Sequence, residues 1–529
     1  MARPHGAVAC GHPVTAEAAT EILQDGGNAY DAAIAAMCAA AVAEPVLCSL
    51  GGGGFMTAAP ADGEPLVYDF FVQTPRRRPA DAAAAGLDFY PIHADFGTAT
   101  QEFHIGLGAM ATPGAVGGLF ALHRDLGSLP MTRLVEPAVR HARAGVALRA
   151  VDSYLFSVVG PILTARPDSR QAFTAEDGRL LTTGERVVQA DLADLFEALA
   201  REGEALFYRG EVARSLAGAC RDLGGLVGEA DLESYEVIRR RPLQRDYRGV
   251  RVLTNPPPST GGLLIAFKLS AMAAIAEEVA PFGAAARVAA LGRVMALTNR
   301  ARRDQHVDDG AGGLQDEAAA ERFLSHELLQ RYLETAERHA PATRGTTHIS
   351  VIDRDGNLAA LTMSNGEGCG YVLPGTGVML NNMLGEEDLN AGGFHRWRPA
   401  TRLASMMAPS IALLPDGSML ALGSGGSNRI RTAIFQVILN LIDHGMTPRE
   451  AVDRPRLHVE AGIANAEEGL GEACRDALRL EADAPFADSV RDWPQHNLFF
   501  GGTHLAMRSA DGRLSAAGDP RRGGVDSIA

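Results

Sequence analysis

The chain has 529 residues, a length that predicts two or three domains or one large intertwined unit. Its 49 basic and 64 acidic residues leave a net charge of −15, which argues against a nucleic-acid partner. The six cysteines are scattered and show no C-x-x-C spacing, so they predict buried thiols in a reducing compartment rather than disulfides or a zinc site.

The N-terminal third is predicted to be helical. Thr15 is expected to cap a helix that ends at the pair Gly26-Gly27, and Asn28 with Asp31 is expected to start the next helix. The apolar run at residues 32–43 follows an acidic segment and is too short to span a bilayer. We therefore expect no secretory leader, a cytoplasmic location and no membrane partner.

The middle of the chain combines one strand with many helices. The glycine run at 51–54 leads into "LVYDFF" (66–71), which predicts a buried strand. Helical patterns dominate from about 131 to 340 and are interrupted by the loop "NPPPSTGG" at 255–262. Lys268 is the only lysine, and its helix-like surroundings predict a surface side chain that extends along apolar neighbours into water.

The C-terminal third changes to hairpins. Three pairs of strand-like segments flank the Asp-Gly turns at 355–356, 416–417 and 511–512, which predicts a substantial antiparallel sheet. A helical segment at 431–445 is expected to cover this sheet, so an α+β layered fold is favoured over a doubly wound parallel sheet. No linker or composition break predicts independent domains.

Two groups of residues are candidates for chemistry. "GSGGSN" (423–428) follows a strand and precedes a helix, so its amides lie near a helix N-terminus and are candidates for an oxyanion hole. The carboxylates at 386–388 are either acid/base groups or an acidic surface turn. His306 and His348 match no triad pattern and are interpreted as structural.

Gly345-Thr346-Thr347-His348 opens the first hairpin. A threonine hydroxyl becomes a good nucleophile when the threonine starts a chain, because its own α-amine, with a pKa of about 7.7 to 8.0, can take the proton. Thr346 reaches that state only if the chain is cut before it. Gly345 has no side chain that would block the approach of the Thr346 hydroxyl to the Gly345 carbonyl. The alternative is an ordinary turn that opens a hairpin.

Seven stretches occur together in one order along nearly the whole chain. They are "GGNAYDAAIAAMCAAAVAEPVLCSLGGGGFM" (26–56), "ATPGAVGGL" (111–119), "NPPPSTGG" (255–262), "TTHISVIDRDGN" (346–357), "LNNML" (380–384), "GSGGSNRIRTA" (423–433) and "GDPRRGG" (518–524). In this order they resemble the γ-glutamyltransferases (glutathione hydrolases), members of the N-terminal-nucleophile hydrolase superfamily.

The resemblance implies a proenzyme that cuts itself between Gly345 and Thr346. Residues 1–345 would form a large subunit and residues 346–529 a small one, held together as a heterodimer in one intertwined αββα sandwich, with higher oligomers left open. By position, the catalytic residues would be the nucleophile Thr346, its hydroxyl neighbour Ser364 and the oxyanion-hole amides of Gly426 and Ser427. The substrate-binding residues would be Asn365, Glu386 and Ser405. The resemblance implies no metal and no organic cofactor.

The sequence departs from the family pattern around the substrate. Phe71 stands where the family has an arginine that binds the glutamate α-carboxylate, and Glu386 stands where it usually has aspartate. Gly425 replaces the usual proline of the glycine loop, and Ala404-Ser405 replaces a serine pair. The arginines that could substitute for the missing one are Arg396, Arg398 and Arg402.

The predicted function is therefore a self-processing amide hydrolase or acyl transferase that cleaves γ-glutamyl amides such as glutathione through an acyl-enzyme on Thr346. One alternative is an amidohydrolase of another small acid amide of the oxamate type, or an acylase that removes β-lactam side chains. A third, from another class, is a non-catalytic scaffold that is never processed.

Overall fold

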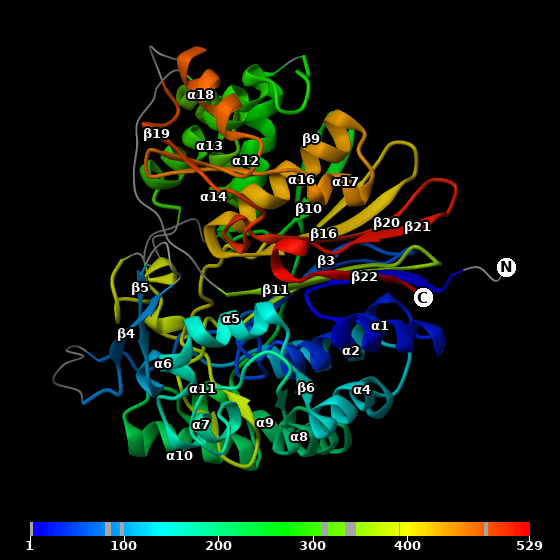
Figure 1. Cartoon of the computed structure of the whole chain (residues 1–529). Coiled ribbons are helices and arrows are strands. Elements are labelled where there is room, and N and C mark those ends of the chain that lie inside the picture. Colours follow the sequence, from blue (N-terminus) through cyan, green and yellow to red (C-terminus); the bar gives the residue numbers. More distant parts are fainter. Residues whose placement is uncertain are drawn as a thin grey trace.

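The computed structural model describes residues 4–79, 86–95, 100–276, 278–307, 316–333, 345–390, 392–480 and 485–529. Two large antiparallel sheets lie at its centre, with helices on the outer side of each (Figure 1). The predicted α+β class is therefore confirmed.

The first sheet has seven strands, and every neighbouring pair is antiparallel. Its central strands are buried along their whole length, because the second sheet covers one face and helices cover the other. In spatial order the strands are β22 (Val525–Ile528), β1 (Gly6–Cys10), β11 (Thr347–Asp353), β12 (Leu358–Ser364), β2 (Gly53–Ala59), β3 (Leu66–Phe70) and β8 (Ile238–Arg240).

The second sheet has six strands, and β11 and β12 of the first sheet pack against its strand β16. Small and branched side chains such as Ala360, Ala421 and Ala506 form the buried layer between the two sheets. In spatial order the strands are β21 (Leu514–Ala517), β20 (Gly502–Arg508), β16 (Met419–Gly425), β15 (Ser410–Leu413), β10 (Val250–Thr254) and β9 (Leu243–Tyr247).

Several helices lie directly on these sheets, among them α3 and α17, which are bounded below. The helices α1 (Pro13–Gln24) and α2 (Ala29–Ala43) contact the first sheet, and α12 (Thr260–Ile275) and α16 (Ile430–His444) contact the second (Figure 1). Every residue of α2 is buried, and its many alanines leave room for α1 and the sheet on opposite sides.

The remaining helices extend both helical regions. On the same side of the first sheet as α2 lie α3 (Ala115–Leu126), α4 (Met131–Ala144), α5 (Ala150–Val158), α6 (Gly160–Leu163), α7 (Pro167–Phe173), α8 (Ala190–Glu202), α9 (Ala205–Tyr208), α10 (Glu211–Leu223) and α11 (Glu229–Glu233), of which α3 and α4 contact α2. Beside α12 and α16 lie α13 (Ala285–Asp304), α14 (Glu317–Phe323), α15 (His326–Leu333), α17 (Pro448–Asp453) and α18 (Gly471–Leu480).

Smaller sheets complete the fold. They are formed by β4 (Tyr90–Asp95) with β5 (Thr100–Ile105), β6 (Val146–Ala147) with β7 (Arg186–Val187), β13 (Val372–Leu373) with β14 (Val378–Met379), and β17 (Leu457–Glu460) with β18 (Ile463–Ala466) and β19 (Ser489–Asp492).

Most of the predicted elements are confirmed. All three Asp-Gly hairpins form, although they belong to two sheets instead of one. Their glycines Gly356, Gly417 and Gly512 have φ values of 96°, 90° and 80°, a conformation that favours glycine. Asn28 and Asp31 form the expected capping box of α2. All six cysteines are buried free thiols.

Three predictions are wrong. The N-cap of α1 is His12, whose ring nitrogen accepts the Val14 amide, and Thr15 lies inside the first turn. The region predicted as helical contains the strands β8, β9 and β10, whose charged sequences hide their alternation. Lys268 is fully buried, because α12 is covered on all sides, and burial lowers the pKa of its amine well below the usual value.

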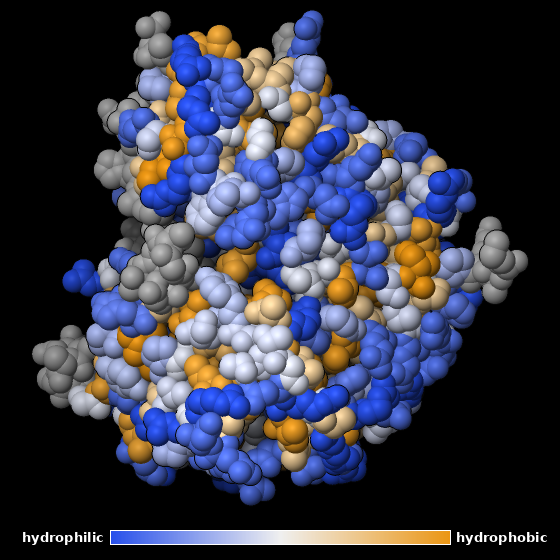
Figure 2. All heavy atoms as spheres, viewed as in Figure 1, coloured by the Kyte–Doolittle hydropathy of each residue, from blue (hydrophilic) through white to orange (hydrophobic). Residues whose placement is uncertain are grey.

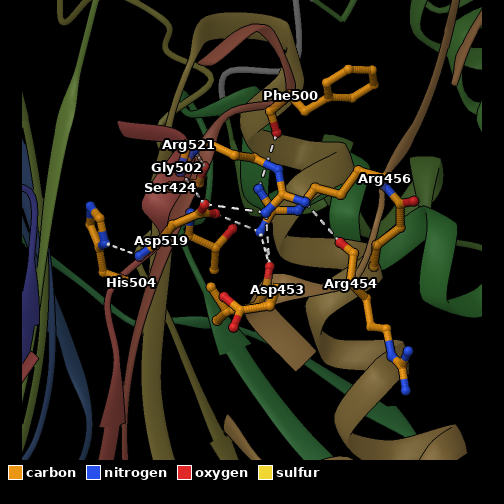
Figure 3. A network of polar contacts seen from close by, with 12 residues as sticks. Ser424, Asp453, Arg454, Arg456, Phe500, Gly502, His504, Asp519 and Arg521 are labelled. Carbon is orange, nitrogen blue, oxygen red and sulfur yellow. Dashed lines mark hydrogen bonds and ion pairs between the residues drawn. The ribbon is translucent and has the colours of Figure 1, made fainter. Parts of the chain in front are cut away.

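A buried ion-pair network fixes the second sheet near its end (Figure 3). Arg521 pairs with Glu467 and Asp519, and Asp519 also pairs with Arg456 at 2.6 Å. Asp519 accepts a hydrogen bond from the Thr503 amide on β20. The preceding residue, Gly502, donates its amide hydrogen bond to the Ser424 hydroxyl on β16. The network therefore holds β20 against the strand that leads into "GSGGSN".

The surface offers no extended apolar face in the view of Figure 2. Apolar residues lie there in small groups separated by hydrophilic ones. Within the described ranges, no helix is both long enough and apolar enough to cross a membrane.

Replacing Arg521 with methionine should destabilise the fold, because Glu467 and Asp519 would lose a buried cation while the volume stays similar. We expect the free energy of unfolding to fall by about 3 to 5 kcal/mol, measured by chemical denaturation. Arg513→Met is the matched control, since the Arg513 side chain is 79% exposed and pairs with Asp511, which is also exposed. Equal stability of the two variants would contradict this role of the network.

Candidate active site

The centre of the site is the peptide bond between Gly345 and Thr346. The Thr346 hydroxyl donates to the Gly345 carbonyl oxygen at 2.6 Å, and the Ser364 hydroxyl donates to the same oxygen at 3.0 Å. Thr346 and Ser364 are 5% and 6% exposed, so this carbonyl is polarised by two hydroxyls in a nearly dry environment. The geometry brings a nucleophile next to the carbonyl that it would attack.

The register of two strands sets this convergence. Thr347 at the start of β11 lies opposite Met363 near the end of β12. The next residue along each strand, Thr346 and Ser364, therefore follows this pair at the same end of the hairpin. The Gly366 amide donates to the Ser364 hydroxyl oxygen at 3.1 Å, which directs the hydroxyl proton toward Gly345.

Glu367 holds the other side of Gly345. Its Oε1 accepts the Gly345 amide at 2.8 Å, and its own amide donates to Asn382 Oδ1 at 3.0 Å. Gly345 is therefore bound through both its N–H and its C=O. This leaves the Gly345–Thr346 bond in one orientation.

The loop that was predicted as an oxyanion hole lies against Thr346. A Cβ on Gly425 would overlap the Thr346 carbonyl oxygen, which explains why glycine stands at this position. Gly426 has a φ of 115° and Ser427 a φ of 54°, so the chain turns sharply between β16 and α16. In the described part of the chain, the amides of Gly426 and Ser427 have no hydrogen-bond acceptor. Both are available to an anion at the start of a helix.

A pocket with a volume of about 40 Å³ opens beside Thr346. Its lining residues are Phe71, Thr260, Gly345, Thr346, Ser364, Met383, Glu386, Asp388, Leu389, Ala404, Ser405, Met406, Met407, Ser427 and Ile430. The walls are mainly apolar, and Glu386 and Asp388 are the two of the three carboxylates at 386–388 that line the pocket. Glu386 is buried, so the interpretation as an acidic surface turn is wrong for it.

The described residues that line the pocket include no arginine or lysine. Arg402 is buried behind Phe71, where it donates to the Phe71 carbonyl oxygen and to Tyr235 and pairs with Asp69 at 3.4 Å. Arg396 and Arg398 are exposed outside the pocket. None of the three arginines takes the place of the one that the family has at position 71.

The predicted substrate-binding residues are in different environments. Glu386 and Ser405 line the pocket and are 2% and 5% exposed. Asn365 is fully buried outside the lining, with its side chain between Gly52 and Gly368. The Ser427 hydroxyl donates to Asp388 at 3.3 Å, which adds a second carboxylate to the wall near the glycine loop.

The neighbouring polar residues are structural. His348 is fully buried between Thr362 and Ser350, and burial lowers the pKa of its ring well below the usual value, in agreement with its predicted structural role. Glu44 accepts the Thr347 hydroxyl at 3.1 Å on the opposite side of β11, and burial raises the pKa of its carboxyl to about 7. No group of three His, Cys, Asp or Glu side chains within the described residues could hold a metal ion.

Sequence reasoning missed two residues of the site. Glu367 was not a candidate, because a lone glutamate in "NGEG" has no recognisable pattern. Arg522, whose Nη1 lies 3.5 Å from the Thr346 carbonyl oxygen, belongs to the quoted "GDPRRGG" stretch, but its function was not assigned. The only available signal was a charged residue next to glycines in a region that matched the family.

Comparison with known proteins identifies the family. The family model described as gamma-glutamyltranspeptidase matches residues 15–529. The Acylase ACY 1 proenzyme of Pseudomonas sp. (strain SE83) is 32% identical over 485 residues, covering 89% of this chain and 86% of that protein. The glutathione hydrolase proenzyme of Escherichia coli (strain K12) is 29% identical over 550 residues, covering 98% and 90%.

Solved structures share the fold. A cephalosporin acylase from Bacillus halodurans superposes with a TM-score of 0.82 at 24% identity, covering 99% of this chain and 96% of that one. The gamma-glutamyltranspeptidase of Helicobacter pylori gives a TM-score of 0.53 at 24% identity, covering 63% and 91%. These likenesses show that the fold is shared. The chain belongs to the γ-glutamyltranspeptidase family, and it is an enzyme of this hydrolase and transferase type.

Replacing Gly425 with alanine should force β11 and β16 apart, because the added methyl group would overlap the Thr346 carbonyl oxygen. We expect a loss of about 1 to 3 kcal/mol in the free energy of unfolding, measured by chemical denaturation. Gly218→Ala in α10 is the control, since the nearest atom to its added Cβ is 3.6 Å away. A Gly425→Ala protein as stable as the control would refute this contact.

Glu44 should make stability depend on pH. Its pKa is raised from 4.5 to about 7, so the folded state keeps a proton that the unfolded state releases. This protonation stabilises the fold by on the order of 3 kcal/mol in the free energy of unfolding. The stabilisation is complete below pH 4.5 and is lost as the pH rises through 7. Glu44→Gln should flatten this slope in denaturation curves recorded from pH 4.5 to 7.5. An unchanged slope would assign the effect to other groups.

Proposed function

We propose that the chain is a self-processing amide hydrolase and acyl transferase with Thr346 as its nucleophile. The observation that supports this most strongly is the pair of hydroxyls on the Gly345 carbonyl. A structural turn needs one such hydrogen bond at most, whereas attack on a carbonyl needs a nucleophile beside it and a donor for the oxygen that becomes negative.

Processing would follow from this geometry. The Thr346 oxygen attacks the Gly345 carbonyl carbon, the C–N bond breaks, and the hydroxyl proton passes to the nitrogen. Gly345 is left as an ester on the Thr346 oxygen, and the nitrogen of Thr346 becomes a free amine. Ser364 donates to the oxygen on which negative charge develops. Water then hydrolyses the ester and releases the carboxyl end of residue 345.

The same residues would then act on substrate. The new α-amine takes the proton of the Thr346 hydroxyl, which attacks the donor amide, and the amides of Gly426 and Ser427 stabilise the oxyanion. Removing one such donor costs about 3 kcal/mol in comparable sites. The amine leaves, and water or an acceptor amine resolves the acyl-enzyme.

Subunits 1–345 and 346–529 would remain together as a heterodimer, because cutting does not separate strands that pair across the break. The strand β11 of the small subunit pairs with β1 of the large one, and β12 pairs with β2. In this proposal the two facing sheets and their outer helices are the four-layer αββα sandwich of the N-terminal-nucleophile hydrolases. Asn365, Glu386 and Ser405 would serve the substrate, and the cytoplasmic location stays a prediction.

The proposed donors are γ-glutamyl amides such as glutathione, as the name of the E. coli relative indicates for that protein. Phe71 favours a second candidate. Because the described pocket lining has no cation for an α-carboxylate, an acylase for another acyl group fits the site as well, and the Pseudomonas relative carries the name acylase.

Replacing Thr346 with alanine should abolish self-cleavage, because the attacking oxygen is lost. Denaturing electrophoresis should show two bands for the natural protein and a single full-length band for Thr346→Ala after long incubation. Thr346→Ser keeps the hydroxyl and should be cut. Two bands from the alanine variant would remove Thr346 from the mechanism, and a single band from the natural protein would support the scaffold alternative.

A further inference from the structure

The pocket beside Thr346 has a hydrocarbon wall that is part of the second sheet's core. Four side chains form this wall, and all four belong to one cluster of buried hydrophobic residues: Phe71, Met383, Met407 and Ile430. Each of them is at most 3% exposed. The wall is therefore the edge of a packed core, and packing on the side away from the pocket holds it in place.

Phe71 is fixed in this wall through its backbone and its ring. Its amide donates to Asp69 Oδ1 at 3.1 Å, and its carbonyl oxygen accepts the Tyr235 hydroxyl at 2.8 Å. Its ring stacks on Phe55, with 5.5 Å between the ring centroids. Arg402 donates to the same carbonyl oxygen and pairs with Asp69 at 3.4 Å. The ring therefore presents a fixed apolar surface to the pocket, while the Arg402 guanidinium is bound to the backbone and to Asp69.

The proposed reaction determines which part of a donor meets this wall. The donor carbonyl carbon becomes bonded to the Thr346 oxygen, and the carbonyl oxygen lies at the amides of Gly426 and Ser427, beside the same pocket. The leaving amine must depart, and water or an acceptor must enter, on a side that is open to solvent. A wall of buried core side chains offers no such path. The acyl chain, which stays attached to Thr346, is therefore the part that lies against the hydrocarbon wall.

The polar part of the lining does not compensate a charge on the acyl chain. Glu386 and Asp388 also line the pocket, and both already interact within the chain. The Ser427 hydroxyl donates to Asp388 at 3.3 Å. The described lining holds no arginine or lysine. A carboxylate at the end of an acyl chain would lose its hydration there without gaining a fixed cation, whereas a methyl group is favoured by leaving water.

The volume of the pocket limits the length of the acyl chain. It is about 40 Å³, and one water needs about 10 to 15 Å³ of such space, so the pocket holds about three water-sized groups. This is room for a chain of about three or four carbons beyond the carbonyl. Met406, a partly buried neighbour of the same core, has an unbranched side chain that adapts to the end of such a chain.

We propose that the mature enzyme carries a short, uncharged aliphatic acyl group on Thr346, and that Phe71 determines this specificity. The amide C–N bond of the donor breaks as the bond to the Thr346 oxygen forms, the hydroxyl proton leaves with the amine, and water then releases the free acid. This inference rests on the proposed function, since it uses Thr346 as the acyl carrier. It names the acyl group of the second candidate there, the acylase.

The test compares four 4-nitroanilides on the fully cut natural protein: acetyl, pentanoyl, glutaryl and γ-glutamyl. Pentanoyl and glutaryl have the same chain and differ only in a terminal methyl group or carboxylate. We expect kcat/KM for pentanoyl to exceed that for acetyl and that for glutaryl at least about tenfold each. A glutaryl or an acetyl donor that is turned over as fast as the pentanoyl donor would overturn the proposal without any variant.

Phe71→Arg provides the second arm, and its cut form is purified before the assay. A guanidinium at this wall should lower the ratio of pentanoyl to glutaryl kcat/KM at least about tenfold, because it pairs with the glutaryl carboxylate. Val188→Arg is the matched control, since Val188 is 54% exposed and lies outside the pocket lining. It should leave the ratio unchanged.

Phe71→Ala tests the wall without adding a charge, and it serves if the arginine variant does not fold. Removing the ring lengthens the pocket, so the kcat/KM ratio of octanoyl to pentanoyl 4-nitroanilide should rise at least about fivefold. The preference for pentanoyl over glutaryl should remain. An unchanged octanoyl ratio would remove Phe71 from the acyl wall.

The outcomes separate this inference from the proposed function. If the natural chain is cut and turns over the γ-glutamyl donor but not the pentanoyl donor, the proposed function stands and the aliphatic acyl group is refuted. A cut chain that turns over none of the four donors also refutes it. If the natural chain stays uncut and no donor is turned over, the proposed function itself fails.

Discussion

Two hydroxyl groups on one carbonyl oxygen are the contact on which the rest of this structure depends. Thr346 and Ser364 reach the Gly345 oxygen because β11 and β12 are neighbours with Thr347 opposite Met363. A shift of β12 by one residue would turn the Ser364 side chain to the other face and separate it from Thr346. The helix layer buries the far face of these strands, so the register is set by packing over the whole sheet. The contact of the two hydroxyls with the Gly345 oxygen is thus determined by the packing of the whole sheet.

The second sheet contributes the complementary part of the site. Its strand β16 ends at Gly425, directly against the Thr346 carbonyl, and the chain then turns at Gly426 into the start of α16. The buried pairs of Arg521 with Glu467 and Asp519 hold the neighbouring strand β20. Burying charged groups costs free energy, so these ion pairs are weak evidence for a gain in stability. Their position fits a role in fixing the end of the strand.

Much of this was predictable from the sequence, and the failures have physical causes. The Asp-Gly turns and the capping box at Asn28 depend on local backbone chemistry, and they were identified correctly. Thr346 and the glycine loop became candidates because the chemistry expected of them needs recognisable residue types, and the structure brings the two together. Lys268 was misplaced, because sequence alone does not show that α12 is covered on all sides. The contact of Glu367 with Gly345 and the ion pair of Arg402 with Asp69 join segments that are apart in the sequence. No local sequence pattern encodes such contacts.

The central claim is that the Gly345–Thr346 bond is made to break. Intact-mass spectrometry of the freshly purified natural protein, followed over time, tests it most directly. We expect the full-length mass to be replaced by two masses, one of which corresponds to a chain that begins at Thr346. A protein that hydrolyses amides while only the full-length mass is present would contradict it.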